Sequence, residues 1–347
     1  MQAAQRQERT RIVVLDGATL NPGYRVGESP GDNPWDEVAA LGELLVYDRT
    51  PPASVLERAA GATVLLVNKT PLAAASIRAL PALRLIAVTA TGTNVVDIEA
   101  AASCAVAVCN VPEYATDSVA QHVFALLLEI TNAVGEHASA VRAGRWQRSE
   151  NFCFWTRPTS ELAGKTMGIV GHGLIGSRVG ELAHAFGMKV LASSPSRSRP
   201  AGYASFEWAT TDRVFAESDV VSLHCPLTRD SAAFVNADLL ARMKPQSILI
   251  NTSRGALIDE QALAAALASG RPAAAALDVL SVEPARDDNP LLAAPGAVIT
   301  PHMAWSTLAA RQRLMHESAV NVAAFLHGRP RNLVTPAPTR SATATDD

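Results

Sequence analysis

The chain has 347 residues, of which 48% are hydrophobic, and it carries a formal net charge of −3 at pH 7. This length suffices for about two domains, and the charge argues against a nucleic-acid-binding surface spread over the whole chain. The four cysteines lack the spacing of metal ligands, so we expect reduced thiols in a cytoplasmic protein with no metal site. No apolar run approaches roughly 20 residues, so we expect no signal peptide and no membrane span.

Short apolar runs alternate with alanine-rich stretches in the first part of the chain. The runs are typical of parallel strands covered on both faces, and the stretches between them are typical of helices. The predicted strands are residues 11–17, 42–48, 62–68, 83–92 and 105–112. This pattern predicts one α/β domain with a parallel sheet.

A long helix is predicted over residues 116–134, with Thr116 or Asp117 as its cap. Its apolar residues fill more than one face, which is typical of a helix buried between domains or in a dimer interface. The next segment, "RAGRWQRSENFCFWTRPTSELAGK", is irregular and rich in aromatic residues and arginine. A long irregular segment within a compact protein is usually functional.

The second half of the chain repeats the alternation of strands and helices. A helix that begins at residue 260 has Gly270 just past its end, and residues 336–347 are low in apolar content and predicted to be disordered. Strands are predicted at residues 166–171, 189–194, 219–226, 247–253, 273–280 and 297–302.

A glycine-rich turn follows the first strand of this second series and opens a helix. The first glycine of a G-x-G-x-x-G pattern allows the tight turn, the second admits a pyrophosphate to backbone amides, and the third lets helix and strand pack closely. The pattern consists of Gly171, His172, Gly173, Leu174, Ile175 and Gly176. It predicts a dinucleotide site, and the alternative is a strand–helix turn with no ligand.

The next strand ends without the acidic residue that commonly holds the cofactor ribose. That position, about 18–20 residues after the turn, falls at Ser193 or Ser194. Serine does not repel a 2′-phosphate, and Arg197, with Ser196 and Arg199 nearby, can supply positive charge. The segment favours NADP; alternatively, the arginines belong to a solvated loop and the cofactor is NAD.

Four polar side chains stand at the ends of successive later strands: Arg254, Asp278, Glu283 and His302. Ligands of open α/β sheets bind at this carboxyl edge, so we expect the four to converge on the nicotinamide. An arginine can clamp a carboxylate, a histidine can pass a proton, a glutamate favours the charged imidazole, and an aspartate can hold the carboxamide. The alternative is that the arginine is an ordinary surface cation and the histidine has only a structural role.

These motifs resemble the D-isomer-specific 2-hydroxyacid dehydrogenases over roughly residues 10–335, most clearly in "GIVGHGLIG", "SLHCPLT", "INTSRGALIDEQALAAAL", "ALDVLSVEP" and "ITPHMAW". The resemblance implies two Rossmann-like domains and a homodimer. It implies that Arg254 binds the substrate carboxylate, Glu283 partners His302, and His302 is the acid/base. The implied substrate domain is 1–115 with 307–335, and the implied dinucleotide-binding domain, inserted in it, is 116–306.

The resemblance also implies contacts elsewhere in the chain. Backbone amides at Thr91, Gly92 and Thr93 would hold the substrate carboxylate. Cofactor contacts would come from His224, Cys225, Pro226, Thr252, Ser253 and Asp278.

Within that family the chain is most similar to the glycerate dehydrogenase and hydroxypyruvate reductase group, through "VNKTPL", "ATGTNVVD", "TDSVAQHVFALLLE" and "GRWQRSENFCFW". This similarity implies that Trp155 approaches a substrate site, sometimes that of the other subunit. Two departures are Thr93, where the group usually has tyrosine, and a segment at residues 23–32 that resembles an insertion. The retained Glu283 argues against the formate dehydrogenase branch.

Together, these features predict an enzyme that reduces a small 2-keto acid such as hydroxypyruvate or glyoxylate to the D-2-hydroxy acid, with NADPH or NADH as hydride donor. One alternative is a dehydrogenase of a larger acid such as phosphoglycerate, for which Lys69 is a candidate basic residue near the 91–93 loop. The other alternative is a dinucleotide-sensing protein of the corepressor type.

Overall fold

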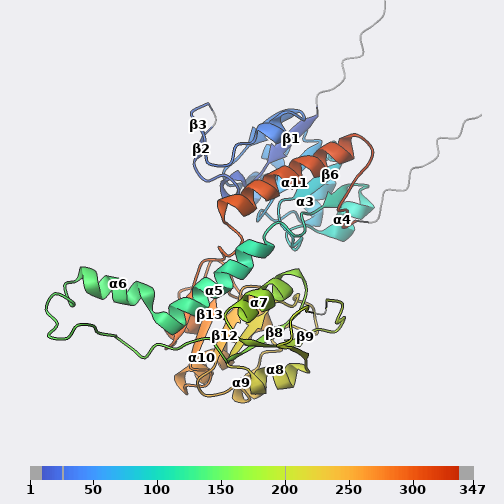
Figure 1. Ribbon diagram of the computed structural model, residues 1–347. Helices are drawn as coiled ribbons and strands as arrows, with labels where there is room; N and C mark the ends of the chain where they lie inside the picture. The colour runs from blue at the N-terminus through green and yellow to red at the C-terminus, as the bar shows by residue number, and fades with distance from the viewer. Residues whose placement is uncertain (1–9, 26, 200, 336–347) are drawn as a thin grey trace, which may run out of the picture. The chain divides into compact units, whose positions relative to one another are not determined.

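The computed structural model describes residues 10–335 apart from residues 26 and 200, so the tail predicted to be disordered lies outside the described residues. The chain forms two compact units (Figure 1). Met1–Tyr114 and Ser306–Asp347 belong to the first unit, and Ala115–Trp305 form the second. Among the described residues, no helix combines the length and the apolar character that a membrane crossing requires.

The first unit contains a five-stranded parallel sheet, which confirms the strands predicted there. Its strand order is β4 (Glu43–Val46), β1 (Arg11–Val14), β5 (Val64–Val67), β6 (Leu85–Val88) and β7 (Ala107–Cys109). The helices of this unit are α1 (Asp36–Ala39), α2 (Val55–Arg58), α3 (Ala74–Arg78), α4 (Ile98–Ser103) and α11 (Leu308–Leu326). β5 and β6 are buried throughout, as their unbroken apolar sequences require.

The segment 23–32 that resembles an insertion forms a small antiparallel hairpin of β2 (Tyr24–Arg25) and β3 (Ser29–Pro30). A bidentate ion pair fixes one end of this segment, because both oxygens of Asp32 lie 2.6 Å from nitrogens of Arg311 on α11. Arg311 is buried, and this pairing lowers the pKa of Asp32. The insertion is therefore anchored to the body of the first unit.

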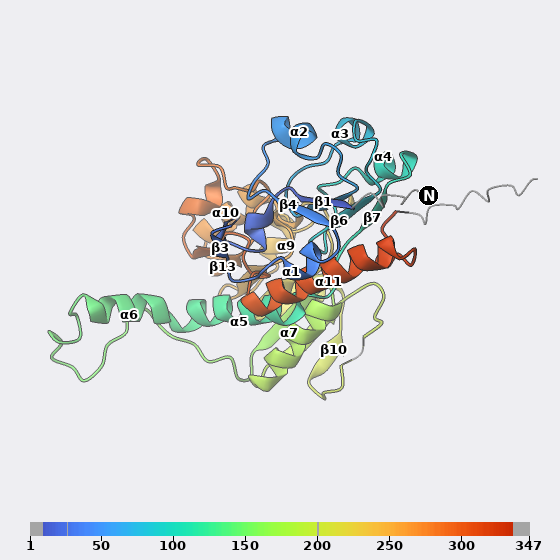
Figure 2. The same cartoon turned by 90° about the horizontal axis from the view of Figure 1, so that it is seen from above.

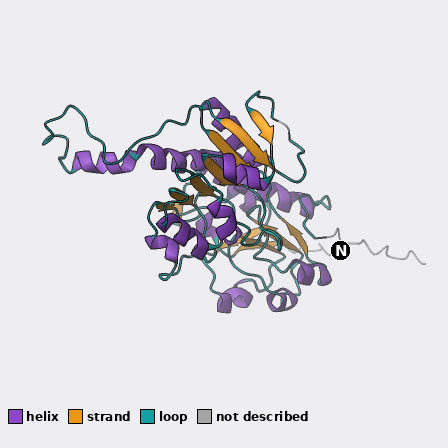
Figure 3. Cartoon of the chain, turned by 90° about the horizontal axis from the view of Figure 1, so that it is seen from below, coloured by secondary structure: helices purple, strands orange, loops and turns teal. Residues whose placement is uncertain are grey.

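The second unit contains a seven-stranded parallel sheet with helices on both faces (Figure 3). The strand order reverses between β8 and β11, and this reversal marks the place where dinucleotides bind in such sheets. The order is β10 (Phe206–Trp208), β9 (Lys189–Ser193), β8 (Thr166–Val170), β11 (Val220–Leu223), β12 (Ile248–Asn251), β13 (Ala274–Leu277) and β14 (Ala297–Ile299). The helices include α7 (Leu174–Ala185), α8 (Thr211–Glu217), α9 (Ala237–Ala241) and α10 (Glu260–Ala268).

The long helix predicted over 116–134 is α5 (Thr116–Asn132), and its buried side chains share a core cluster with the seven-stranded sheet. The predicted cap is wrong. Thr116 and Asp117 lie inside the helix, its N-cap is Ala115, and no side chain makes a capping hydrogen bond there.

A second helix that the sequence pattern did not predict lies between α5 and the irregular segment. Ala133 adopts a left-handed backbone conformation, with φ at 49°, which ends α5 and starts α6 (Val134–Arg142). Figure 2 shows α6 and the loop after it projecting from the rest of the second unit. We refer to residues 134–158 as the arm.

Candidate active site

The glycine turn between β8 and α7 is built for close approach to a ligand. Gly171 has a φ of 94°, and a Cβ on it would lie 2.4 Å from the backbone nitrogen of Cys225. A Cβ on Gly176 would lie 2.2 Å from the carbonyl oxygen of Gly171. Gly173 is the N-cap of α7, makes no side-chain cap and faces open space. The first-turn amides of Leu174 and its neighbours therefore suit a pyrophosphate.

The middle of the turn contributes backbone rather than side chains. His172 is only 2% exposed, and its ring packs against Phe206 and Trp208 at centroid distances of 5.0 and 5.3 Å. Burial lowers the pKa of His172, which keeps the imidazole neutral at physiological pH. Ile175 packs against the core of the unit. Both side chains thus pack against other residues of the unit.

The end of β9 has no carboxylate to bind a ribose. The Ser193 hydroxyl lies 2.9 Å from the hydroxyl of Thr211 at the start of α8, and Ser194 follows it as the first residue beyond the strand. The Arg197 guanidinium lies 6.0 Å from the centre of the Trp208 ring, with its backbone at a φ of 44°. The hydroxyls and this guanidinium can face a phosphate, whereas a carboxylate would repel one.

The ends of β11 and β12 hold buried polar atoms without protein partners. His224 Nε2 lies 2.8 Å from Ser222 Oγ, and burial lowers the pKa of His224 to about 3. Within the described part of the chain, His224 Nδ1 and Thr252 Oγ1 have no hydrogen-bond partner. Buried polar groups are almost always paired in proteins, so these atoms fit a polar ligand at the strand ends.

Three more of the predicted cofactor contacts lie in the same loops. Ser253 donates from its hydroxyl to the Leu223 carbonyl at 3.0 Å, which ties the β12 loop to β11. Cys225 packs against the core, and its burial raises the pKa of the thiol. Pro226 is exposed and accepts a hydrogen bond from Ser231. The raised pKa disfavours the reactive thiolate form of Cys225.

His302 stands in a sharp turn after β14. Its backbone has a φ of 52°, a left-handed conformation that is unfavourable for a residue with a side chain. The surrounding groups hold it: its N–H donates to the Asp278 carbonyl at 2.8 Å, and Trp305 Nε1 donates to its carbonyl at 3.0 Å. Because His302 follows β14, it lies at the carboxyl end of that parallel strand.

The buried carboxylate of Asp278 organises this turn. Its oxygens accept from the amides of Met303 and Ala304 at 2.9 and 2.8 Å and from Thr300 Oγ1 at 2.6 Å. Burial would raise the pKa of Asp278, but these hydrogen bonds and one from His122 outweigh burial and lower it. The carboxylate therefore stays ionised at every physiological pH, and its chief contacts are with the turn that carries His302.

Helix α5 also contacts this turn through two side chains one helical turn apart. The Ser118 hydroxyl donates to the Ala304 carbonyl at 2.6 Å. His122 Nε2 lies 3.0 Å from Thr300 Oγ1. Because the Thr300 hydroxyl donates to Asp278, it accepts from His122, so a chain of donors runs from α5 to the buried carboxylate. Neither α5 residue was predicted from the sequence, although a histidine in a largely apolar helix was the available signal.

Glu283 and His302 form the closest acid–base pair at this edge, with 2.6 Å between Glu283 Oε2 and His302 Nδ1. The other Glu283 oxygen accepts from the Leu280 amide at 3.2 Å, and Glu260 accepts from the Ser281 amide at 2.6 Å. The loop that carries Glu283 is thus held at two points. The carboxylate on Nδ1 leaves His302 Nε2 as the nitrogen available for proton transfer.

Arg254 follows β12, which pairs with β13, the strand that leads to Asp278. One of its nitrogens donates to the Ser253 carbonyl at 2.7 Å. The next residue, Gly255, packs so tightly that a Cβ would lie 1.9 Å from the carbonyl carbon of Leu280. Only glycine fits here, and this contact joins the arginine loop to the loop that leads to Glu283.

The first unit holds four of the residues predicted to bind substrate, Lys69, Thr91, Gly92 and Thr93. Within the described residues, the backbone N–H groups of Thr91, Gly92 and Thr93 donate to no protein acceptor, and such consecutive amides suit an anion. Asp16 holds the loop of Lys69, a role that was not predicted from the sequence. The buried Asp16 carboxylate accepts from the amides of residues 68–70 at 2.6 to 2.8 Å.

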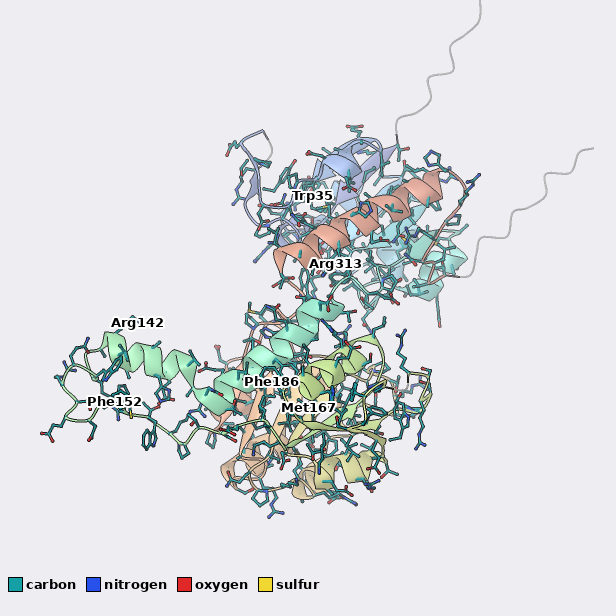
Figure 4. The ribbon with its side chains drawn as sticks, viewed as in Figure 1. Trp35, Arg142, Phe152, Met167, Phe186 and Arg313 are labelled. Atoms are coloured by element: carbon teal, nitrogen blue, oxygen red, sulfur yellow. The ribbon has the colours of Figure 1, made fainter. Side chains whose placement is uncertain are left out.

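Trp155 lies on the arm and, within one chain, does not join the residues around His302. The arm folds on itself, because Arg145 stacks over Phe154 at 4.6 Å and Trp146 donates to the Phe152 carbonyl at 3.0 Å. Its outer side chains are uncovered: Phe152 is 90% exposed and Trp155 is 65% exposed. Figure 4 shows Phe152 on the projecting arm.

Comparison with known proteins identifies the fold and chemistry of these units. Residues 124–304 match the family described as D-isomer specific 2-hydroxyacid dehydrogenase, NAD binding domain. The chain belongs to this family. It falls in the group of the glycerate dehydrogenases and hydroxypyruvate reductases, as its sequence motifs predict, and its two units are the Rossmann-like folds of these enzymes.

Three relatives illustrate the likeness. The hydroxypyruvate reductase of Blautia hydrogenotrophica is 43% identical over 327 residues, which cover 93% of this chain and 99% of that protein. The glycerate dehydrogenase of Methylorubrum extorquens is 40% identical over 93% of this chain and 98% of that protein. A crystal structure of the NADPH-dependent glyoxylate/hydroxypyruvate reductase of Sinorhizobium meliloti, with NADP and malonate, matches at a TM-score of 0.78 and 27% identity, covering 95% of this chain and 98% of that one.

Replacing His122 with leucine tests whether α5 positions the His302 turn of this dehydrogenase. The change removes the donor to Thr300 and places an apolar side chain of similar size on the helix. We expect kcat to fall about ten-fold, because small displacements of an acid/base group are costly, while KM for the cofactor stays within about two-fold. Steady-state kinetics measure both constants.

The His122→Gln variant keeps a donor and should recover most of the lost kcat. The His327→Leu variant, at the exposed end of α11, is the matched control and should behave as wild type. An unchanged kcat in His122→Leu, or an equal loss in both histidine-to-leucine variants, would contradict a positioning role for His122.

Proposed function

We propose that this dehydrogenase reduces hydroxypyruvate and glyoxylate, giving D-glycerate from the first and glycolate from the second. The observation that carries the proposal is the 2.6 Å pair of Glu283 and His302, on the sheet edge that also presents Arg254. A charged imidazole is the proton donor that carbonyl reduction needs. The named relatives favour this activity over a larger substrate or a corepressor role.

Each residue of the site has a separate role in the proposed reduction. Arg254 neutralises the substrate carboxylate and polarises the adjacent carbonyl, and the amides of 91–93 contribute donors to the same carboxylate. His302 gives the proton on Nε2 to the carbonyl oxygen. Glu283 stabilises the imidazolium before transfer by holding Nδ1. The bound nicotinamide supplies the hydride that reaches the keto carbon.

We propose NADP as the preferred cofactor. The hydroxyls of Ser193 and Ser194 replace the usual carboxylate at the end of β9, and Arg197 lies over Trp208 beside them. A 2′-phosphate would pair with this guanidinium without meeting an opposing acidic group in residues 193–199. The Sinorhizobium meliloti relative, an NADPH-dependent reductase, supports the same choice.

We also propose a homodimer in the cytoplasm. The arm exposes Trp146, Phe152 and Trp155, and large aromatic side chains gathered on a projecting segment favour burial against a second copy. Trp155 would then meet the partner rather than its own His302. The four free cysteines support a reducing compartment.

The activity and the cofactor preference are tested together. Oxidation of NADPH and of NADH is followed with hydroxypyruvate, glyoxylate and pyruvate, for wild type and Arg197→Ala. We expect turnover of the first two acids, with kcat/KM higher for NADPH. Arg197→Ala should raise KM for NADPH about ten-fold and leave KM for NADH unchanged, because only NADPH has the 2′-phosphate.

Arg242→Ala, which removes another exposed arginine of the same unit, is the control and should not change either KM. An equal effect of Arg197→Ala on both cofactors would exclude the phosphate contact. Absence of turnover with all three acids would exclude the proposed activity.

The dimer is tested by sedimentation velocity on wild type and the double variant Phe152→Ser, Trp155→Ser. Wild type should sediment with twice the mass of one chain, and the variant should shift toward one chain because the apolar contact is lost. Leu292→Ser, which alters an exposed side chain elsewhere in the unit, should remain dimeric. A wild type with the mass of one chain would refute the dimer.

A further inference from the structure

The first unit contains a pocket that the proposed reaction does not use. It has a volume of about 520 Å³ and lies where β1 and β4 end, with the insertion hairpin as one wall. This volume falls within the range of small-molecule sites. Figure 1 shows the hairpin, labelled β2 and β3, at the edge of this unit.

The pocket is strongly cationic. Three of its lining residues are Arg25, Arg49 and Arg58, and the only carboxylate in the lining is Asp48. Asp48 pairs with Arg25 at 3.2 Å. Arg49 is exposed and, among the described residues, has no partner for its guanidinium. The lining therefore carries a net charge of +2, which a phosphate monoester, with a charge of about −1.5 to −2, would balance.

Aromatic contacts fix the shape of this cationic wall. The Arg58 guanidinium lies 4.5 Å from the centre of the Tyr47 ring, and one of its nitrogens donates to Thr50 Oγ1 at 3.1 Å. Tyr24, on the hairpin, also lines the pocket. Two phenol rings beside three guanidiniums offer stacking surface for the organic part of a ligand and planar forks for its anionic part.

The backbone supports the floor of the pocket. The Gly17 amide donates to the Tyr47 carbonyl at 2.8 Å, and a Cβ on Gly17 would lie 2.6 Å from a methyl group of Val46. The Ala18 amide donates to the Asp48 carbonyl at 3.2 Å. This close packing holds the β1 and β4 ends together, so the arginines are presented from a fixed base.

We propose that this pocket, bounded by the insertion hairpin, binds a small phosphate monoester with an organic group that contacts Tyr24 and Tyr47. Arg49 and Arg58 pair with the phosphate oxygens, and Arg25 contributes from the hairpin. Its lining includes none of the residues assigned to the proposed reaction.

Isothermal titration with inorganic phosphate and with phenyl phosphate tests the proposal on the full chain, independently of turnover. Wild type should bind one phenyl phosphate per chain in this pocket, more tightly than inorganic phosphate because the rings contribute. Arg49→Ala should weaken binding of both probes at least ten-fold, since charge-assisted pairs to phosphate are lost.

Two variants control for charge and location. Arg78→Ala removes an exposed arginine of the same unit outside the pocket and should bind as wild type. Arg197→Ala should also leave this binding unchanged, because that arginine belongs to the proposed cofactor site. No saturable binding, equal affinity for the two probes, or a loss in Arg197→Ala with Arg49→Ala intact would each overturn the proposal.

Discussion

The buried carboxylate of Asp278 is the interaction on which the candidate site depends. It gathers the amides of Met303 and Ala304 and the hydroxyl of Thr300 around one ionised group. That arrangement stabilises His302 in a left-handed backbone conformation that its side chain would otherwise disfavour. The resulting direction of the imidazole lets Glu283 reach Nδ1. A charge buried away from solvent thus sets the geometry of the proposed acid/base group.

Two patterns in the sequence predicted the parallel strands and the pairing of Glu283 with His302. Unbroken apolar runs predicted the parallel strands, because both faces of each sheet are covered and few polar residues interrupt them. Strand-end positions predicted that Glu283 and His302 would lie together, because parallel strands present their carboxyl ends at one edge. The pairing of Glu283 with His302 is the direct structural result of that spacing.

Features that depend on backbone atoms or on distant contacts were not predictable. Asp16 and Asp278 act by accepting from amides, and every residue except proline carries an amide, so the sequence contains no specific signal for the partner. The break at Ala133 was missed because alanine favours helix and gives no sign of a left-handed turn. The role of His122 required knowledge of which strand end lies beneath α5.

We propose that His302 supplies the proton when hydride reaches the keto carbon. Single-turnover oxidation of bound NADPH by hydroxypyruvate, compared between wild type and His302→Gln, measures this step without product release. We expect the rate to fall about 10³-fold in the variant, within the range for loss of a general acid, with NADPH affinity unchanged. Equal single-turnover rates in the two proteins would contradict it.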